Sequence, residues 1–95
     1  MYKITYHPRV RKQLKKIPKK ESDNIQKVIK DLSNKPFDGD SFDLKKVEDD
    51  PLAFRCRVGQ YRIVYVVYKY DKIIDIRRVQ HRQWNYKKIY TFFQL

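Results

Sequence analysis

The sequence is poor in the features that several large classes of protein require. It has a single cysteine, Cys56, so no disulfide can form within the chain, and one unpaired cysteine favours a reducing, cytoplasmic location. It contains no apolar run of membrane-spanning length, and its first twenty residues are charged rather than signal-like. It also lacks an internal repeat, a glycine-rich phosphate loop, zinc-ligand spacing and a catalytic Ser/His/Asp order, so we expect neither a metal nor a cofactor.

Acidic residues are scarce relative to basic ones. The chain has 11 Asp and Glu against 23 Lys and Arg, which gives a net charge of +12. Residues 1–20 hold eight basic residues and no acid, residues 21–53 carry a net −4, and residues 54–95 carry a net +8. An excess of this size favours a polyanionic partner, above all a nucleic acid, although an acidic protein or a membrane surface would also satisfy it. The acidic turn at residues 48–50 has no histidine nearby and is not interpreted as a metal site.

What the sequence does contain is a clear β-hairpin. Residues alternate between apolar and polar from Phe54 to Tyr65, and Gly59-Gln60 in the middle suits a two-residue loop of type II′. This loop places Arg57 opposite Arg62 and Cys56 opposite Ile63. One face then reads as core, with Phe54, Cys56, Val58, Tyr61, Ile63 and Tyr65, and the other face carries Arg55, Arg57 and Arg62.

The arginines of the second face are the more informative set. Like charges directly opposite in an antiparallel pair are destabilising by roughly 0.2–1 kcal/mol. Their presence indicates a ligand that brings negative charge, and the planar fork of arginine fits phosphate best. The alternative is a solvated basic face on a basic protein.

The remaining elements fit one domain that spans residues 1–95. A hydrophobic content of 41% argues against disorder, and the length suits one modest core. A strand at residues 1–6 precedes a helix that begins near Pro8 and ends at Pro18. A second helix, capped by Ser22 or Asp23, ends at residues 34–36. Strands follow at 44–47, 63–68 and 73–80, and by alternation the last one adds Asp75, Arg77, Val79 and His81 to the arginine face.

In this order, the elements closely resemble the RelE/ParE superfamily of toxin–antitoxin toxins, and its RelE branch in particular. The resemblance covers about residues 2–90 and is most specific in residues 57–65 and in His81-Arg82 with Tyr86. It implies an α+β fold, with an N-terminal helical hairpin on one side of a small, twisted, mainly antiparallel sheet. It also implies a type II toxin that cuts mRNA in the ribosomal A site without a metal, through attack of the 2′-hydroxyl to leave a 2′,3′-cyclic phosphate. Its partners would be a RelB-like antitoxin, the ribosome and mRNA.

The resemblance also implies roles for individual residues. Arg62 matches the family's central phosphate-binding arginine, and Arg82 matches a second one. Tyr86 matches a tyrosine that contacts the nucleotide, whereas Lys45 and Lys46 lie in a stretch that touches the RNA backbone.

Arg55 and Arg57 stand where RelE-like proteins often carry lysines, and this departure changes the proton chemistry. Arginine stays protonated at any ordinary pH, so neither residue can carry a proton in the reaction. Histidine titrates near neutral pH, so His81 becomes the candidate general acid or base, with Tyr86 as its substitute. The structural alternative for His81 is a strand-end histidine that is satisfied by the backbone.

Two other functions are compatible with the sequence. A ParE-like toxin shares the fold and the Gly-x-Tyr-Arg hairpin but inhibits DNA gyrase and cuts nothing. A degenerate relative would bind only RNA or its antitoxin. The retention of His81, Arg82 and Tyr86 beside the hairpin arginines favours the nuclease.

Overall fold

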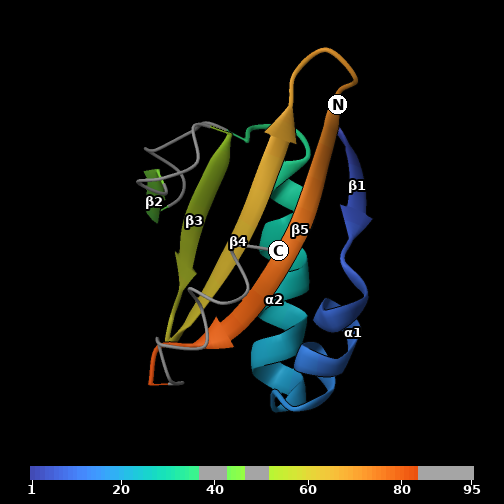
Figure 1. Ribbon diagram of the computed structural model, residues 1–95. Helices are drawn as coiled ribbons and strands as arrows, with labels where there is room; N and C mark the ends of the chain where they lie inside the picture. The colour runs from blue at the N-terminus through green and yellow to red at the C-terminus, as the bar shows by residue number, and fades with distance from the viewer. Residues whose placement is uncertain (37–42, 47–51, 84–95) are drawn as a thin grey trace.

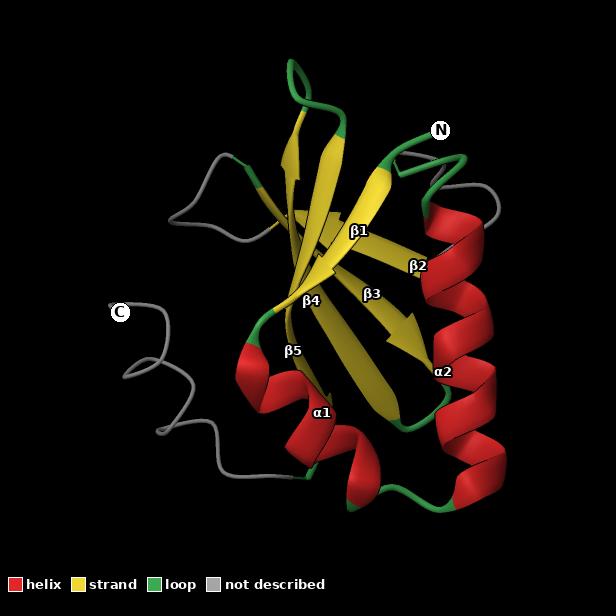
Figure 2. Cartoon of the chain, turned by 90° about the vertical axis from the view of Figure 1, so that its right-hand side faces the viewer, coloured by secondary structure: helices red, strands yellow, loops and turns green. Residues whose placement is uncertain are grey.

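Two helices cover one face of a five-stranded sheet. The computed structural model describes residues 1–36, 43–46 and 52–83. The elements are β1 (Lys3–Tyr6), α1 (Pro8–Lys15), α2 (Lys19–Leu32), β2 (Asp43–Lys46), β3 (Ala53–Val58), β4 (Tyr61–Tyr68) and β5 (Ile73–His81). The strand order is β1-β5-β4-β3-β2, in which β1 and β5 are parallel and all other pairs antiparallel. This confirms the predicted α+β class with a mainly antiparallel sheet and a helical hairpin on one side (Figure 1, Figure 2).

The helices form because apolar residues recur at helical spacing and face the sheet. Val10 of α1 and the stripe Ile25, Ile29 and Leu32 of α2 are at most 1% exposed and belong to one core cluster. From the sheet, Cys56, Ile63 and Tyr65 enter the same cluster. None of the described helices is long and apolar enough to cross a membrane.

Helix α2 begins one turn earlier than the sequence predicted. Its N-cap is Pro18, and the Ser22 N–H already donates to the Pro18 carbonyl at 2.9 Å. Ser22 is 8% exposed and lies inside the helix, where its hydroxyl accepts a hydrogen bond from Gln26. The prediction of a cap at Ser22 or Asp23 was therefore wrong. The helix already includes Lys19 and Lys20, and its N-cap, Pro18, has no side chain that could cap it.

The β3–β4 hairpin has the predicted register. Arg57 pairs with Arg62 and Cys56 with Ile63, so Gly59 and Gln60 form a two-residue loop. Gly59 has a φ of 59°, and Lys72 is the one other described residue with positive φ. A positive φ at the first loop position alone is the pattern of a type II′ turn, which confirms the predicted loop type.

We expect Gly59→Ala to lower the free energy of unfolding by about 1–3 kcal/mol, because a residue with a Cβ is strained at this positive φ. No heavy atom lies within 4 Å of the position of an added Cβ, so the cost comes from the backbone alone. Urea denaturation followed by circular dichroism measures it. Gln60→Ala is the matched control, with an expected change within about 0.5 kcal/mol. Equal destabilisation by the two variants would contradict this account of the loop.

A β-bulge in β5 changes which side chains share a face. Val64 pairs with Arg78, but the next residue, Tyr65, pairs with Ile76, so Arg77 is an extra residue on β5. Beyond this point the alternation of β5 is shifted by one residue. Asp75, which pairs with Val66, precedes the bulge and lies on the arginine face as predicted.

Val79 and His81 were predicted on the arginine face, and this was wrong. Val79 pairs with Ile63 and is fully buried with it in the core cluster beneath the helices. His81 pairs with Tyr61, which also packs against that cluster. The physical reason is the bulge at Arg77, after which Arg78 and Gln80 take the places on the arginine face.

Helix α1 is fixed to the sheet at the edge of β5. Strand β1 pairs with β5 only as far as Ile76, and beyond it the Val79 N–H donates to the Gln13 side-chain oxygen at 2.8 Å. This hydrogen bond satisfies a backbone donor that no strand reaches. At the other end of α1, the N–H of its cap residue His7 donates to the Ile76 carbonyl at 2.8 Å and holds the first turn beside the bulge.

Candidate functional site

The centre of the candidate site is a pair of arginines on the sheet face opposite the helices. Arg57 of β3 and Arg62 of β4 stand directly opposite each other. Their neighbours Cys56 and Ile63 point into the core, so the two guanidinium groups start from the outer face. Arg57 is exposed, while Arg55 and Arg62 are partly exposed. The arginine face therefore carries Arg55, Arg57, Arg62, Arg78 and Gln80, with Asp75 further along β5.

Strand β5 contributes two residues that the sequence analysis missed. Gln80 pairs with Arg62, and Arg78 pairs with Val64. Arg78 is 5% exposed, and its Nη1 donates to the Gln80 side-chain oxygen at 3.3 Å. Burial lowers the pKa of Arg78 to about 10, and the charge of Arg9 adds to this effect. Arg78 therefore adds positive charge behind Arg62 rather than a group that a ligand can readily touch.

Arg82 follows β5 at the end of the sheet where the β3–β4 loop lies. Its backbone N–H donates to the Gln60 carbonyl at 2.8 Å, so the ladder continues one step beyond the strand. Arg82 is exposed and, two residues after Gln80, continues the alternation of the arginine face. The structure thus brings Arg82 to the same end of the sheet as the Arg57–Arg62 pair.

His81 lies on the opposite side of the sheet from that pair. Its ring meets the Tyr61 ring edge-on, with centroids 5.1 Å apart and an angle of 88°. Its Nδ1 accepts a hydrogen bond from the Gln83 N–H at 3.1 Å, which places the proton of the neutral ring on Nε2. The imidazole is partly exposed at the edge of the sheet, without facing the arginines directly.

For two other predicted residues the structure gives the backbone register alone, and a third lies outside the described residues. Lys45 pairs with Arg55 and Lys46 with Phe54 in the backbone register of β2 and β3. Tyr86 lies outside the described residues.

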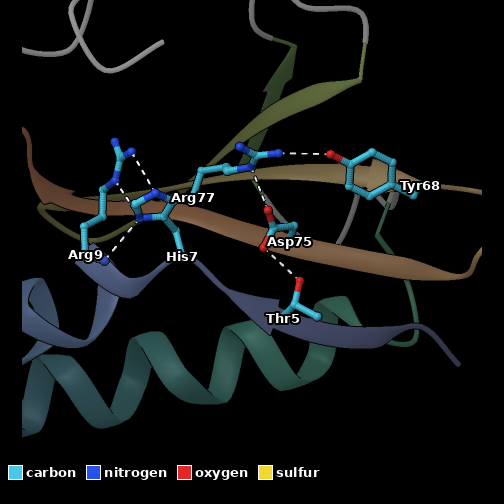
Figure 3. A network of polar contacts seen from close by, with 6 residues as sticks. All are labelled: Thr5, His7, Arg9, Tyr68, Asp75 and Arg77. Atoms are coloured by element: carbon cyan, nitrogen blue, oxygen red, sulfur yellow. Dashed lines mark hydrogen bonds and ion pairs between the residues drawn. The ribbon is translucent and has the colours of Figure 1, made fainter. Parts of the chain in front are cut away.

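A polar network at the other end of β5 was not anticipated (Figure 3). The Thr5 hydroxyl donates to Asp75 at 2.8 Å, Arg77 Nε lies 2.7 Å from the Asp75 carboxylate, and Arg77 Nη2 donates to the Tyr68 hydroxyl at 2.9 Å. His7 caps α1, where its Nδ1 accepts from the backbone N–H of Arg9 at 3.2 Å and from Arg9 Nε at 2.9 Å. Arg77 lies two residues after Asp75 and on the same face, as the alternation predicted, and the bulge that follows it brings Arg78 to this face as well.

The environment of His7 favours its neutral form. Partial burial has the largest effect and lowers the pKa of the imidazole. The positive charges of Arg9, Arg77 and Arg78 lower it further. The Asp75 carboxylate acts in the opposite direction. A neutral ring is also what the cap requires, because a protonated Nδ1 cannot accept a hydrogen bond.

The free energy of unfolding should therefore decrease as the pH is lowered, because of His7. An imidazole with a lowered pKa in the folded protein binds fewer protons than in the unfolded chain, so its contribution is complete above about pH 6.5 and is lost as the pH falls from there through the folded-state pKa. His7→Asn keeps a cap acceptor that does not titrate, so the variant should lose less stability than the wild type between about pH 7 and pH 5. His7→Ala should cost about 0.5–2 kcal/mol at pH 7. Denaturant unfolding across this pH range tests both, and parallel curves for wild type and His7→Asn would contradict the assignment.

The comparisons with known proteins now identify the family. The family model described as the ParE toxin of the type II toxin–antitoxin system parDE matches residues 4–86. The chain belongs to the RelE/ParE family. Its sequence is 33% identical over 86 residues to RelE1 of Methanocaldococcus jannaschii, a match that covers 90% of this chain and 96% of the relative. This RelE/ParE toxin is accordingly a RelE-like toxin of a type II system.

Solved structures agree with this assignment. The archaeal RelE–RelB complex from Pyrococcus horikoshii contains a chain with a TM-score of 0.77 and 29% identity, which covers 88% of this toxin and 98% of that chain. The RelB–RelE complex from Methanococcus jannaschii gives a TM-score of 0.70 and 30% identity, with 94% and 98% covered. The isolated RelE toxin of Escherichia coli, at 14% identity and a TM-score of 0.74 with 99% and 98% covered, shares the fold.

Proposed function

We propose that this RelE-like toxin is an endoribonuclease that cleaves mRNA in the ribosomal A site and thereby inhibits translation. The observation that supports this proposal most is the pair Arg57–Arg62 on the outer face of the sheet, with Arg82 at the same end. Opposed guanidinium groups repel each other, and a phosphate diester brings a negative charge that both can bind.

The proposed reaction needs no metal. The 2′-oxygen of the ribose attacks the adjacent phosphorus and loses its proton to a solvent water, while the bond to the 5′-oxygen breaks and that oxygen gains a proton from the general acid. The products are a 2′,3′-cyclic phosphate and a 5′-hydroxyl. Arg62 and Arg82 bind the non-bridging oxygens, where negative charge grows in the transition state, and Arg55 and Arg57 stabilise the same charge from β3.

His81 is the proposed proton carrier at the edge of the site. To act as the general acid, the ring must be the imidazolium: Nδ1 takes up a proton and gives up its hydrogen bond from the Gln83 N–H, and Nε2 then donates its proton to the leaving 5′-oxygen. Because the ring lies beside Tyr61 rather than on the arginine face, the scissile bond must sit at the rim of the sheet, between Arg82 and His81. Tyr86 is the proposed second group for this role.

The proposed partners follow from the relatives and the charge. The solved complexes from Pyrococcus horikoshii and Methanococcus jannaschii pair RelE with RelB, and we extend this to a RelB-like antitoxin for the present toxin. The net charge of +12 suits the ribosome and mRNA as the target in the cytoplasm. Lys45 and Lys46 are proposed to contact the RNA backbone from β2, where Lys45 stands in register with Arg55.

A second function is inhibition of DNA gyrase without nuclease activity. The match to the ParE model over residues 4–86 favours it, and so does the position of His81 away from the arginine face. A ParE-like toxin would use the same basic surface to bind a partner and would need no proton carrier.

One experiment separates the two functions. The purified toxin is added to ribosomes programmed with a defined mRNA, and cleavage is mapped by primer extension, while gyrase supercoiling is measured in parallel. Cuts within the A-site codon that disappear on addition of antitoxin support the nuclease. Inhibited supercoiling with intact mRNA supports the gyrase inhibitor and overturns the nuclease proposal.

A further inference from the structure

A second group of cations lies where α1 meets β5, apart from the Arg57–Arg62 pair. It consists of Arg9, Arg77 and the next residue of β5, Arg78. His7 lies between Arg9 and Arg77 (Figure 3). The backbone holds Arg9 and Arg77 close together, because the His7 N–H donates to the carbonyl of Ile76, the neighbour of Arg77, at 2.8 Å, and Arg9 Nε donates to His7 Nδ1 at 2.9 Å. The only acidic residue recorded in this part of the described chain is Asp75.

Arg77 is held in a fixed orientation within this group. Its Nε lies 2.7 Å from Asp75, which in turn accepts from Thr5, and its Nη2 donates to Tyr68. The side chain is nevertheless 41% exposed. A guanidinium group that is already held by hydrogen bonds but is still exposed to solvent loses little conformational entropy when it binds an oxyanion. This is the property of a preorganised site.

The group lies on the same face of the sheet as the proposed cleavage site. Arg77 joins Asp75 and Tyr68 on that face, and the Arg78–Gln80 hydrogen bond connects it to Arg62, which pairs with Gln80. From strand spacing and rise, Arg77 and Arg62 are separated by roughly 10 Å at the backbone. One extended strand of nucleic acid can therefore touch both.

We propose that Arg77 and Arg9, supported by Arg78 from behind, form a second binding site for a backbone phosphate of RNA, away from the scissile one. Phosphate is favoured over a carboxylate ligand because residues 1–20 add a further run of basic residues and no acid beside this group. The site would set which way the RNA strand runs across the sheet. This inference rests on the proposed function in taking RNA as the ligand, but binding alone tests it.

The test is fluorescence anisotropy of a labelled single-stranded RNA oligonucleotide at a series of salt concentrations. Arg77→Gln should weaken binding about fivefold at 0.1 M salt and reduce the slope of log K against log salt by about 0.7, as expected for the loss of one phosphate contact. Arg9→Gln, which leaves the Asp75–Tyr68 network intact, should have a similar effect. Lys27→Gln removes the same charge from an exposed position on α2 and should leave the slope unchanged.

The possible outcomes are distinguishable. If Arg62→Gln weakens RNA binding but Arg77→Gln and Arg9→Gln behave like Lys27→Gln, the second site is wrong and the proposed function stands. If the wild-type toxin binds RNA without salt dependence and cuts no mRNA, the proposed function itself has failed. If Arg77→Gln weakens only the binding of poly-glutamate, the ligand is a carboxylate and the phosphate proposal is overturned. Thermal unfolding of each variant excludes a folding defect as the cause.

Discussion

Arg62→Ala is expected to lower the rate of mRNA cleavage on programmed ribosomes by about 10²–10³-fold, the usual effect of removing one preorganised group that stabilises transition-state charge. Arg62 lies at the middle of the arginine face, with Arg57 opposite on one side and Gln80 on the other. The free energy of unfolding should change by no more than about 1 kcal/mol, because the substitution also relieves the repulsion from Arg57. Single-turnover cleavage and urea denaturation together provide the measurement.

Two further variants serve as controls for Arg62→Ala. Arg62→Lys keeps the charge but loses the bidentate fork, so its rate should fall between those of wild type and Arg62→Ala. Lys27→Ala, on the far side of the molecule, should cleave at the wild-type rate. An Arg62→Ala protein that cleaves within threefold of wild type would remove the arginine pair from the mechanism.

The hairpin could be predicted from the sequence because its register depends on local chemistry. A two-residue loop allows one pairing of the flanking strands, and Gly59 supplies the positive φ that this loop needs. Once Arg57 and Arg62 are opposite each other, the burial of their neighbours Cys56 and Ile63 follows from alternation. The arginine pair of the candidate site could therefore be predicted from the sequence alone.

The bulge was not predicted, and it decides the rest of the site. The apolar residues Ile74, Ile76 and Val79 are spaced by two and then by three, which is the signal of an extra residue at Arg77. Strict alternation ignored this spacing and placed His81 with the arginines. The start of α2 shows a similar limit, because the helix begins after Pro18 with no side-chain cap to mark it in the sequence.

The cation group at His7 and Arg77 could not be found from the sequence for a different reason. It joins the first turn of α1 to the bulge of β5, about seventy positions away in the chain, as the Thr5–Asp75 hydrogen bond does. Neither segment carries a motif by itself. Only the parallel pairing of β1 with β5 brings the two segments together.

Tyr65→Ala is expected to lower the free energy of unfolding by about 3–5 kcal/mol, because it removes the largest fully buried side chain of the described core. The ring stacks on Phe54 at a centroid distance of 5.7 Å, and the hydroxyl donates to the Pro36 carbonyl at 2.9 Å. Burial raises the pKa of this phenol, with a smaller contribution from Cys56, so the hydroxyl remains a donor at every working pH. Urea denaturation followed by circular dichroism measures the loss.

Tyr65→Phe separates the two contributions of this residue. It keeps the ring but leaves the Pro36 carbonyl without its donor, so we expect a loss of about 1–3 kcal/mol. A domain of this size has only about 5–15 kcal/mol of stability, so Tyr65→Ala should reduce toxin activity through unfolding, whereas Arg62→Ala should slow cleavage in a protein that stays folded. If Tyr65→Phe is as destabilising as Tyr65→Ala, the hydrogen bond to the segment after α2 outweighs the packing, and the core is held together by that contact rather than by the ring.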